Sequence, residues 1–295
     1  MVSAAAASDP GSSVPAIFHD GSRPSELYFI TSIENVHSIL KHGILSHKRA
    51  ASHNPTSIAN DEVQSRREHK IFSNPDREQT AKERLPIHRC VNLYIRAHNA
   101  MLFVKKEQRA DLCVFRIHPQ ILGRCEVVIA DRNASKDDAR FYQARDFCFS
   151  PVSSEMLQNP LSLVWNDKET LGKAEKRKYV RQAEVLIPYA LHPSYIQGIF
   201  VADSRAREKL LNIINGTKYK DNLPVDIHPT LFFSTDTKNR EGTNPLARIN
   251  AAPLRNGVYP RLHEELPESS DEEHETHVEQ DFSLPMEEDI AGVDE

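Results

Sequence analysis

Glu184 is the first residue of the apolar run EVLIPY, residues 184–189, and a carboxylate at that position needs an explanation. In a strand its side chain would share one face with Leu186. Five basic residues lie in the stretch 173–181 just before it. One interpretation is an edge residue paired with Arg181 or with one of the lysines of that stretch. The other is a carboxylate held on a rigid strand at the rim of a cleft, where it orients a hydroxyl or takes a proton.

Two adjacent arginines, Arg66 and Arg67, lie in the polar stretch QSRREHK. Such a pair is often solvated. A fixed guanidinium can also hold a phosphate by bidentate hydrogen bonds, with a geometry that lysine does not match. From the sequence alone, either arginine could be that phosphate anchor.

The segment VNLYIRAHNAMLF, residues 91–103, combines an apolar run with aromatic, basic and amide side chains. One interpretation is a core strand that runs into a polar turn. The alternative is a surface for a single strand of nucleic acid, on which bases stack on aromatic rings while Arg96 or Asn99 contacts their edges. Both interpretations stay open at this point.

Several common catalytic and cofactor-binding motifs are absent from the sequence. It has no P-loop, no G-x-G-x-x-G fingerprint, no H-E-x-x-H and no G-x-S-x-G nucleophile elbow. The cysteines Cys90, Cys113, Cys125 and Cys148 show no C-x-x-C spacing, so we interpret them as reduced and structural. A zinc site would need a tighter cluster, and we therefore expect no metal.

The elements that must position these residues are mostly short strands. Strands are predicted at 27–31, 90–95, 111–117, 125–131, 184–189 and 198–203. A helix capped by Asp203 or Ser204 should follow the last of them. Many strands with few helices between them favour an α+β fold, with central mixed or antiparallel sheets flanked by helices.

Between the first two strands the sequence predicts two helices. The first has Ile33, Val36, Ile39 and Leu40 on one face and should end at Gly43, while Thr31 and Glu34 fit a capping box at its start. A second, short amphipathic helix is expected within the polar stretch 46–88, through Ile58, Val63 and Ile71.

Charge divides the chain into regions. Residues 264–295 contain fourteen of the 42 acidic residues and no Lys or Arg, so 28 acidic residues face 37 basic ones elsewhere, a surplus of nine positive charges. A basic body suggests an anionic partner, although a solvated surface of mixed charge is the alternative.

We predict a flexible leader over 1–24, a catalytic domain over 25–240 and a disordered acidic tail over 241–295. The sequence has no membrane-length apolar run, and we expect a cytoplasmic protein, with the nucleus as an alternative.

Taken in order, five stretches carry a resemblance to a known family: LYFITSIENVHSILKHGIL, SIANDEVQSRR, VNLYIRAHNAMLF, DARFYQ and RQAEVLIPY. Over about residues 25–215 the chain resembles DarT, the toxin of the DarT–DarG toxin–antitoxin pair. That family uses NAD to attach ADP-ribose to a base in single-stranded DNA. The resemblance implies an ADP-ribosyltransferase-like fold, NAD as co-substrate, and transfer to thymidine or guanosine with release of nicotinamide.

Site residues follow from the resemblance position by position. Arg67 and Glu184 are implied as catalytic, with Glu184 exposed at its strand start and facing NAD, and Arg67 also binding NAD. Further residues implied in the NAD pocket are Phe29, Ile30, Thr31, Ser38 and Leu45. For DNA binding we expect Tyr94, Arg96, His98, Asn99, Met101 and Arg181. Replacing Glu184 by Ala should then abolish transfer and leave the fold intact.

The chain departs from the family pattern at Phe29, where the family usually has His. A His can hydrogen-bond a ribose or an amide, whereas Phe can only stack. A second hypothesis is therefore a catalytically weak homologue that binds nucleic acid, and a third is a transferase that acts on RNA or protein. The expected partners are single-stranded DNA and a DarG-like macrodomain antitoxin, with no membrane.

Overall fold

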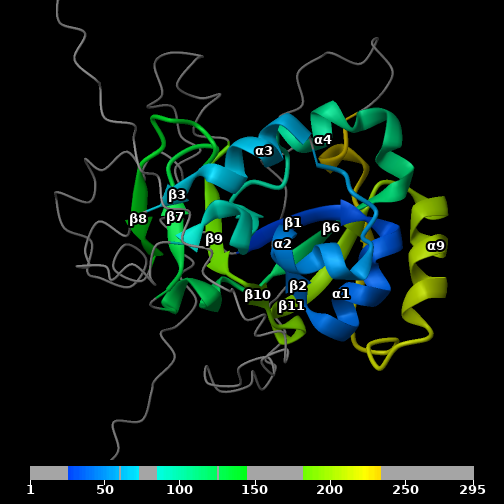
Figure 1. The fold of residues 1–295 in the computed structure, drawn as a ribbon. Helices are drawn as coiled ribbons and strands as arrows, with labels where there is room; N and C mark the ends of the chain where they lie inside the picture. The colour runs from blue at the N-terminus through cyan, green and yellow to red at the C-terminus, as the bar shows by residue number, and fades with distance from the viewer. Residues whose placement is uncertain (1–25, 60, 73–84, 125, 145–181, 234–295) are drawn as a thin grey trace, which may run out of the picture.

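The computed structural model describes residues 26–59, 61–72, 85–124, 126–144 and 182–233. In these residues eight strands form one sheet (Figure 1). Adjacent strands are antiparallel except β11 and β12, which are parallel, so the sheet is mixed as expected. In spatial order the strands are β12 (Val225–Ile227), β11 (Ile196–Val201), β6 (Leu112–Ile117), β1 (Leu27–Ser32), β5 (Cys90–Tyr94), β9 (Glu184–Pro188), β7 (Val128–Ala130) and β8 (Phe141–Gln143).

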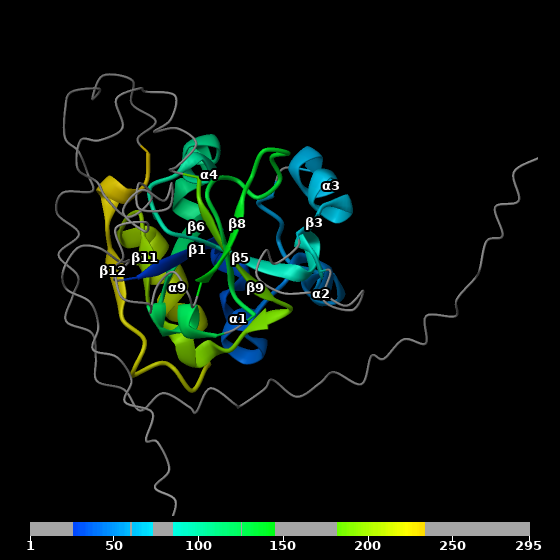
Figure 2. The same cartoon turned by 90° about the vertical axis from the view of Figure 1, so that its left-hand side faces the viewer.

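Helices and short two-stranded sheets surround this sheet. The α-helices are α1 (Val36–His42), α2 (His47–Ala50), α3 (Asp61–His69), α4 (Ala100–Val104) and α9 (Ser204–Ile214). The 3-10 helices are η1 (Ile33–Asn35), η2 (Ala51–His53), η4 (Ile87–Arg89), η5 (Lys106–Asp111), η6 (Pro119–Gly123), η7 (Pro193–Tyr195) and η8 (Pro229–Leu231). The small sheets pair β10 (Ala190–Leu191) with β2 (Ile44–Leu45), and β3 (Ile71–Phe72) with β4 (Leu85–Pro86). In Figure 2, α2, α3 and β3 gather on the side of the molecule opposite β11 and β12.

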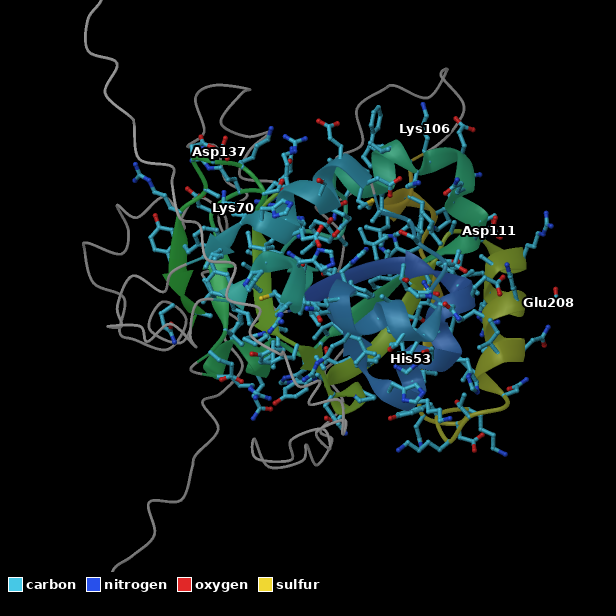
Figure 3. All side chains as sticks on the ribbon, viewed as in Figure 1. His53, Lys70, Lys106, Asp111, Asp137 and Glu208 are labelled. Carbon is cyan, nitrogen blue, oxygen red and sulfur yellow. The ribbon has the colours of Figure 1, made fainter. Side chains whose placement is uncertain are left out.

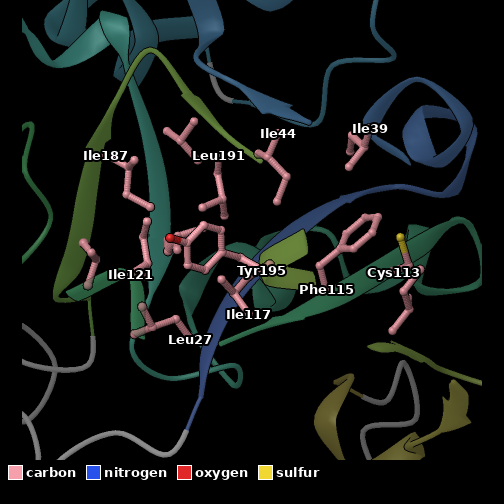
Figure 4. Packing of buried hydrophobic residues seen from close by; sticks show 14 of the residues in the cluster. Leu27, Ile39, Ile44, Cys113, Phe115, Ile117, Ile121, Ile187, Leu191 and Tyr195 are labelled. Carbon is pink, nitrogen blue, oxygen red and sulfur yellow. The ribbon is translucent and has the colours of Figure 1, made fainter. Parts of the chain in front are cut away.

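One face of the sheet carries the main hydrophobic core. Side chains alternate between the faces of a strand, and Leu27, Val185 and Ile187 belong to this face. The apolar sides of α1 and α9 cover it, through residues such as Ile39 and Leu210. Figure 4 shows part of this packing, with Ile39 near the strand residue Phe115. The continuous core leaves little space for polar groups on this face.

The opposite face is mixed in character. Two smaller apolar clusters lie on it, one under α4 and η8 and one under β3, β4 and η4. Between them Tyr28 of β1 pairs in register with Tyr94 of β5, and Tyr94 pairs in turn with Glu184 of β9. Residues in register on adjacent strands point to the same face. Glu184 therefore lies on this mixed face, in the interior of the sheet rather than at an edge.

The first helical segment agrees with the sequence prediction except at its cap. The residues Ile33, Val36, Ile39 and Leu40 are all buried, and Gly43 ends α1 with a positive φ of 86°. The cap, however, is Ser32, whose side chain accepts from the Glu34 amide at 3.3 Å. Thr31 instead accepts from Asn35 Nδ2 at 3.0 Å, so the N-cap lies one residue later than predicted.

Two other helical predictions need correction. The helix α3 includes Val63, but Ile58 precedes it and Ile71 lies in β3 with 52% of its surface exposed. The polar face of α3 thus dominates, and its buried side chain is Arg67. Met101 lies in α4, so the predicted strand of the segment 91–103 runs into a short helix as well as a turn. The helix after β11 is confirmed, because Asp203 accepts from the Ala206 amide at 2.9 Å.

The predicted leader and acidic tail lie outside the described residues, so the predicted boundaries of the catalytic domain stay a prediction. Within the described ranges, no helix has the length and hydropathy needed to cross a membrane. Nor do the His, Cys, Asp and Glu residues of those ranges form a group of three or more that could hold a metal ion. Cys90 and Cys113 are buried free thiols, while Cys125 and Cys148 lie outside the described part.

Candidate active site

The centre of the site is a buried ion pair between Arg67 of α3 and Glu184 of β9. Arg67 Nη2 donates to both carboxylate oxygens, at 2.7 Å to Oε1 and 2.9 Å to Oε2. Glu184 is 0% exposed and Arg67 5% exposed. The expectation that Glu184 is exposed at a strand start is therefore wrong, because β9 lies between β5 and β7 and the guanidinium covers the carboxylate.

Two further donors hold the carboxylate in place. Asn92 Nδ2, from β5, donates to Oε2 at 3.0 Å, and the backbone N–H of Ala134 donates to the same oxygen at 3.3 Å. Next to Ala134, Asn133 Oδ1 accepts from Arg67 Nη2 at 3.4 Å and from Ser135 Oγ at 2.7 Å. The carboxylate is thus fixed by groups from α3, β5 and the segment after β7.

The electrostatics keep Arg67 charged. Burial alone would lower the pKa of Arg67, but the nearby Glu184 carboxylate outweighs it and raises that pKa above its usual value. Arg67 Nε is buried and has no hydrogen-bond partner among the described residues. Arg66, by contrast, is exposed and pairs with Glu62 of the preceding helical turn at 3.0 Å. Of the two arginines, only Arg67 is built into the site.

Four other titratable side chains interact electrostatically with Arg67. Burial raises the pKa of Tyr94 well above its ordinary value and that of Cys90 to about 12, so both stay protonated at neutral pH. His47 Nδ1 and His88 Nε2 are 2.8 Å apart, and burial lowers the pKa of both imidazoles, as does the Arg67 charge. Both histidines are therefore neutral near pH 7.

The residues expected to line the NAD pocket divide between the two faces of the sheet. Ile30 lies on the face of Glu184, whereas Phe29 packs against Phe115 on the opposite face, with ring centroids 6.5 Å apart. Thr31 shares the face of Phe29 by strand alternation. Ser38 in α1 and Leu45 in β2 are half-buried. The NAD-binding role of these five residues stays a prediction.

The residues expected to bind DNA also have different environments. Tyr94 lies beside Glu184 in register, whereas Asn99 caps α4 and accepts from the amides of Met101 at 3.0 Å and Leu102 at 3.4 Å. Its amide is thus already occupied and 4% exposed. His98 bonds to the Leu231 carbonyl at 2.9 Å. Arg96 and Met101 are half-buried, and Arg181 lies outside the described residues.

Several groups around the ion pair were missed from the sequence: Asn92, Asn133, the Ala134 amide, His47 and His88. Asn92 lies in an apolar run, and its position two residues before Tyr94 on the same strand face is the one signal that could have marked it. The histidines are far apart in the chain, and no spacing rule connects them.

Comparison with known families identifies a match over most of the described region. The family model described as "ssDNA thymidine ADP-ribosyltransferase, DarT" matches residues 28–233. A curated relative from Thermosipho africanus, a DNA ADP-ribosyl transferase–DNA ADP-ribosyl glycohydrolase fusion protein, is 28% identical over 213 residues. The alignment covers 70% of this chain and 49% of that protein, so the chain spans about half the length of this relative.

Solved structures agree on the fold. The Thermosipho africanus DarTG structure in complex with ADP-ribose has a TM-score of 0.56 and 28% identity, covering 71% of this chain and 51% of its own. Thermus sp. 2.9 DarT in complex with ADP-ribosylated single-stranded DNA has a TM-score of 0.55 and 22% identity, covering 71% and 97%. The same Thermus protein with NAD⁺ has a TM-score of 0.53 and 18% identity, covering 72% and 98%. The expected ADP-ribosyltransferase-like fold is confirmed.

Proposed function

Because this chain belongs to the DarT family, we propose that it is an NAD-dependent ADP-ribosyltransferase that modifies a base in single-stranded DNA. Thymidine is the proposed acceptor, as in the family description. The transfer breaks the bond between nicotinamide and ribose and forms a bond between the ribose C1″ and a nitrogen of the base. The proposal takes support from relatives that carry ADP-ribose, NAD⁺ or ADP-ribosylated DNA.

The observation that carries the proposal is the buried pair of Arg67 and Glu184. Positive charge develops on the ribose as nicotinamide leaves, and a preorganised carboxylate stabilises it. In a site that excludes water this electrostatic contribution is worth about 3 kcal/mol or more. Glu184 is suited to this role because three different donors orient it and because β9 is an interior strand.

Arg67 has a second role, which fits the chemistry of a dinucleotide. Its contacts to Glu184 and Asn133 all come from Nη2, while the buried Nε has no partner among the described residues. A diphosphate oxygen would satisfy Nε and attract the guanidinium away from Glu184. We propose that NAD binding exchanges one anionic partner of Arg67 for another and exposes the carboxylate to the ribose.

The remaining residue assignments are proposals on the same basis. Phe29, Ile30, Thr31, Ser38 and Leu45 are proposed around NAD, and Tyr94, Arg96, His98, Met101 and Arg181 near the DNA. Asn99 is proposed to act indirectly, by fixing the start of α4 after Arg96 and His98. The proposed partner is a DarG-like glycohydrolase antitoxin, supported by the fusion of the two activities in the Thermosipho relative. A cytoplasmic location is likewise proposed.

The test is incubation of the purified protein with NAD and mixed single-stranded oligonucleotides, followed by intact mass analysis. We expect the mass of one ADP-ribose to be added to thymidine-containing DNA. Glu184→Gln and Arg67→Gln should remove the adduct, whereas Arg66→Gln is the matched control and should retain it, because Arg66 is exposed and pairs with Glu62. An adduct on RNA or protein alone would move the acceptor, and no adduct on any substrate would contradict the enzyme.

A further inference from the structure

The loop between β7 and β8, residues 131–140, contacts both members of the buried ion pair. The backbone N–H of Ala134 donates to Glu184 Oε2 at 3.3 Å, and Asn133 Oδ1 accepts from Arg67 Nη2 at 3.4 Å. Ala134 is 0% exposed, so its N–H is not open to water. The conformation of this loop therefore decides whether one of the donors to the Glu184 carboxylate is in place.

Asp131, the first residue of the loop, joins its two ends. Its Oδ1 accepts from the backbone N–H of Arg140 at 3.1 Å, and its own backbone N–H donates to the Arg140 carbonyl at 3.1 Å. Asp131 is 4% exposed, and Arg132 donates to both carboxylate oxygens, from Nε at 3.0 Å and from Nη2 at 3.1 Å. Hydrogen bonds to an ionised carboxylate are strong and directional. The Asp131 side chain thus closes the base of the loop.

Hydrogen bonds inside the loop connect this closed base to the ion pair. Asn133 Oδ1 accepts from the Ser135 N–H at 3.0 Å and from Ser135 Oγ at 2.7 Å, and the Asn133 carbonyl accepts from the Lys136 N–H at 3.0 Å. Lys70, which follows α3, donates to the Lys136 carbonyl, and in Figure 3 it lies next to Asp137 of this loop. The loop is therefore held at its base and, in its middle, to the end of α3.

The two oxygens of Glu184 have different donors. Among the described residues Oε1 accepts from Arg67 only, whereas Oε2 accepts from Arg67, from Asn92 Nδ2 and from the Ala134 N–H. When NAD draws the guanidinium away, as proposed above, Oε2 keeps two donors and Oε1 is free to face the ribose. The orientation of the carboxylate then depends on Asn92, which β5 fixes, and on Ala134, which the loop fixes.

We propose that Asp131 is a positioning residue of the transferase site: it closes the 131–140 loop so that the Ala134 N–H holds Glu184 Oε2 and Oε1 faces the ribose. The inference rests on the proposed function and adds a residue to it. Asp131 acts through the backbone of the loop and not by contact with NAD or DNA. Opening the loop removes one donor from Oε2 while Asn92 stays on β5, so the carboxylate remains in the site but loses its fixed orientation.

The loop also contains a matched control for Asp131. Asp138 is an acidic residue of the same loop and pairs with the same Arg132, but its side chain is 71% exposed. Its substitution removes the same charge and the same type of ion pair, and it leaves the hydrogen bonds between Asp131 and Arg140 in place. A difference between variants at the two positions therefore reports the closure of the loop and not its net charge.

The experiment compares wild type, Asp131→Ala, Asp131→Asn and Asp138→Ala. Circular dichroism at the assay temperature shows whether each variant is folded. The rate of transfer to an oligothymidine is measured by mass at saturating NAD, and NAD affinity is measured separately by calorimetry. Exchange of the Ala134 amide hydrogen is measured by NMR, which reports the position of this donor without any reference to activity.

We expect Asp131→Ala to lower the transfer rate about 10²-fold, because a small misplacement of a reacting group has an effect of this size. NAD affinity should change little, and the Ala134 amide should exchange faster. Asp131→Asn keeps an oxygen that can accept from the Arg140 N–H, so its rate and its exchange should lie between those of Asp131→Ala and wild type. This variant carries the test if Asp131→Ala does not fold. Asp138→Ala should match wild type in all three measurements.

Wild-type exchange at Ala134 in folded Asp131 variants would overturn the inference, whatever their activity. So would fast exchange with an unchanged transfer rate, a loss of rate that follows NAD affinity, or an equal loss in Asp138→Ala. An inactive wild type would instead refute the proposed function, and the exchange measurement would still decide whether Asp131 positions the Ala134 amide.

Discussion

Breaking the Arg67–Glu184 pair should lower the unfolding free energy of the protein as well as its transfer activity. Removing one member of a buried ion pair typically costs about 3 to 5 kcal/mol, because the other charge stays buried without compensation. Glu184 is 0% exposed and Arg67 5% exposed, so water cannot reach either group without structural change. The earlier expectation that Glu184→Ala leaves the fold intact conflicts with this burial. A loss of activity in that variant would not by itself separate catalysis from folding.

A double-mutant cycle isolates the interaction. Glu184→Leu and Arg67→Met should each lose about 3 to 5 kcal/mol of unfolding free energy. The double variant leaves no unpaired charge at this ion-pair site, but the donors of Asn92 and Ala134 lose their acceptor, at about 1 to 3 kcal/mol each. We therefore expect the double variant to be less destabilised than the summed single losses, with a coupling of about 2 kcal/mol or more.

The assay is urea denaturation followed by circular dichroism, at one protein concentration and without NAD. Additive effects of the two substitutions would refute the reasoning, because they would mean that the two charges do not interact in the folded protein. A Glu184→Leu variant as stable as the wild type would do the same, since it would show that the Arg67 guanidinium is hydrated without its partner.

Two further predictions concern residues outside the ion pair. Asn99→Ala should lower the unfolding free energy by about 1 kcal/mol, because the Asn99 side chain caps α4. The control Asn212→Ala, on the exposed side of α9, should change the unfolding free energy little. Urea denaturation of both variants measures the difference. Burial lowers the pKa of His118 to about 4, below the ordinary 6.5, so the unfolded chain binds the extra proton first. The contribution of neutral His118 to the unfolding free energy is thus fully present above about pH 6.5. This contribution should be lost progressively as the pH drops toward 4. Melting temperatures measured across this pH range should show a weaker decline for His118→Gln.

The sequence predicted the strands better than the helices, for identifiable reasons. Alternating or continuous apolar residues, as in 184–189, indicate a strand directly, and β9 begins at Glu184 as expected. The helix at Met101 was missed because Asn99 caps it, and a single polar residue after a strand resembles a turn. The helix α3 has a polar surface throughout, so its periodicity could not indicate which residue is buried.

The site was predictable in part. Arg67 and Glu184 were identified through family resemblance, and the structure brings them into contact across 117 positions of sequence. No local pattern predicts that contact, because it depends on how β9 and α3 pack in three dimensions. Asn92 and the pair of His47 and His88 were missed for the same reason. Their significance comes from neighbours that are remote in the chain.

The position of β9 in the sheet has a consequence for how the protein is made. β5 and β7 precede β9 in the chain, yet β9 separates them in the sheet and pairs with both. During synthesis, a nascent chain that has emerged only through β8 therefore has open edges on β5 and β7, and such edges can pair with other chains. Glu184, the first residue of β9, arrives with the strand that closes this gap. The carboxylate of the buried ion pair therefore enters the sheet together with the strand that covers these two edges.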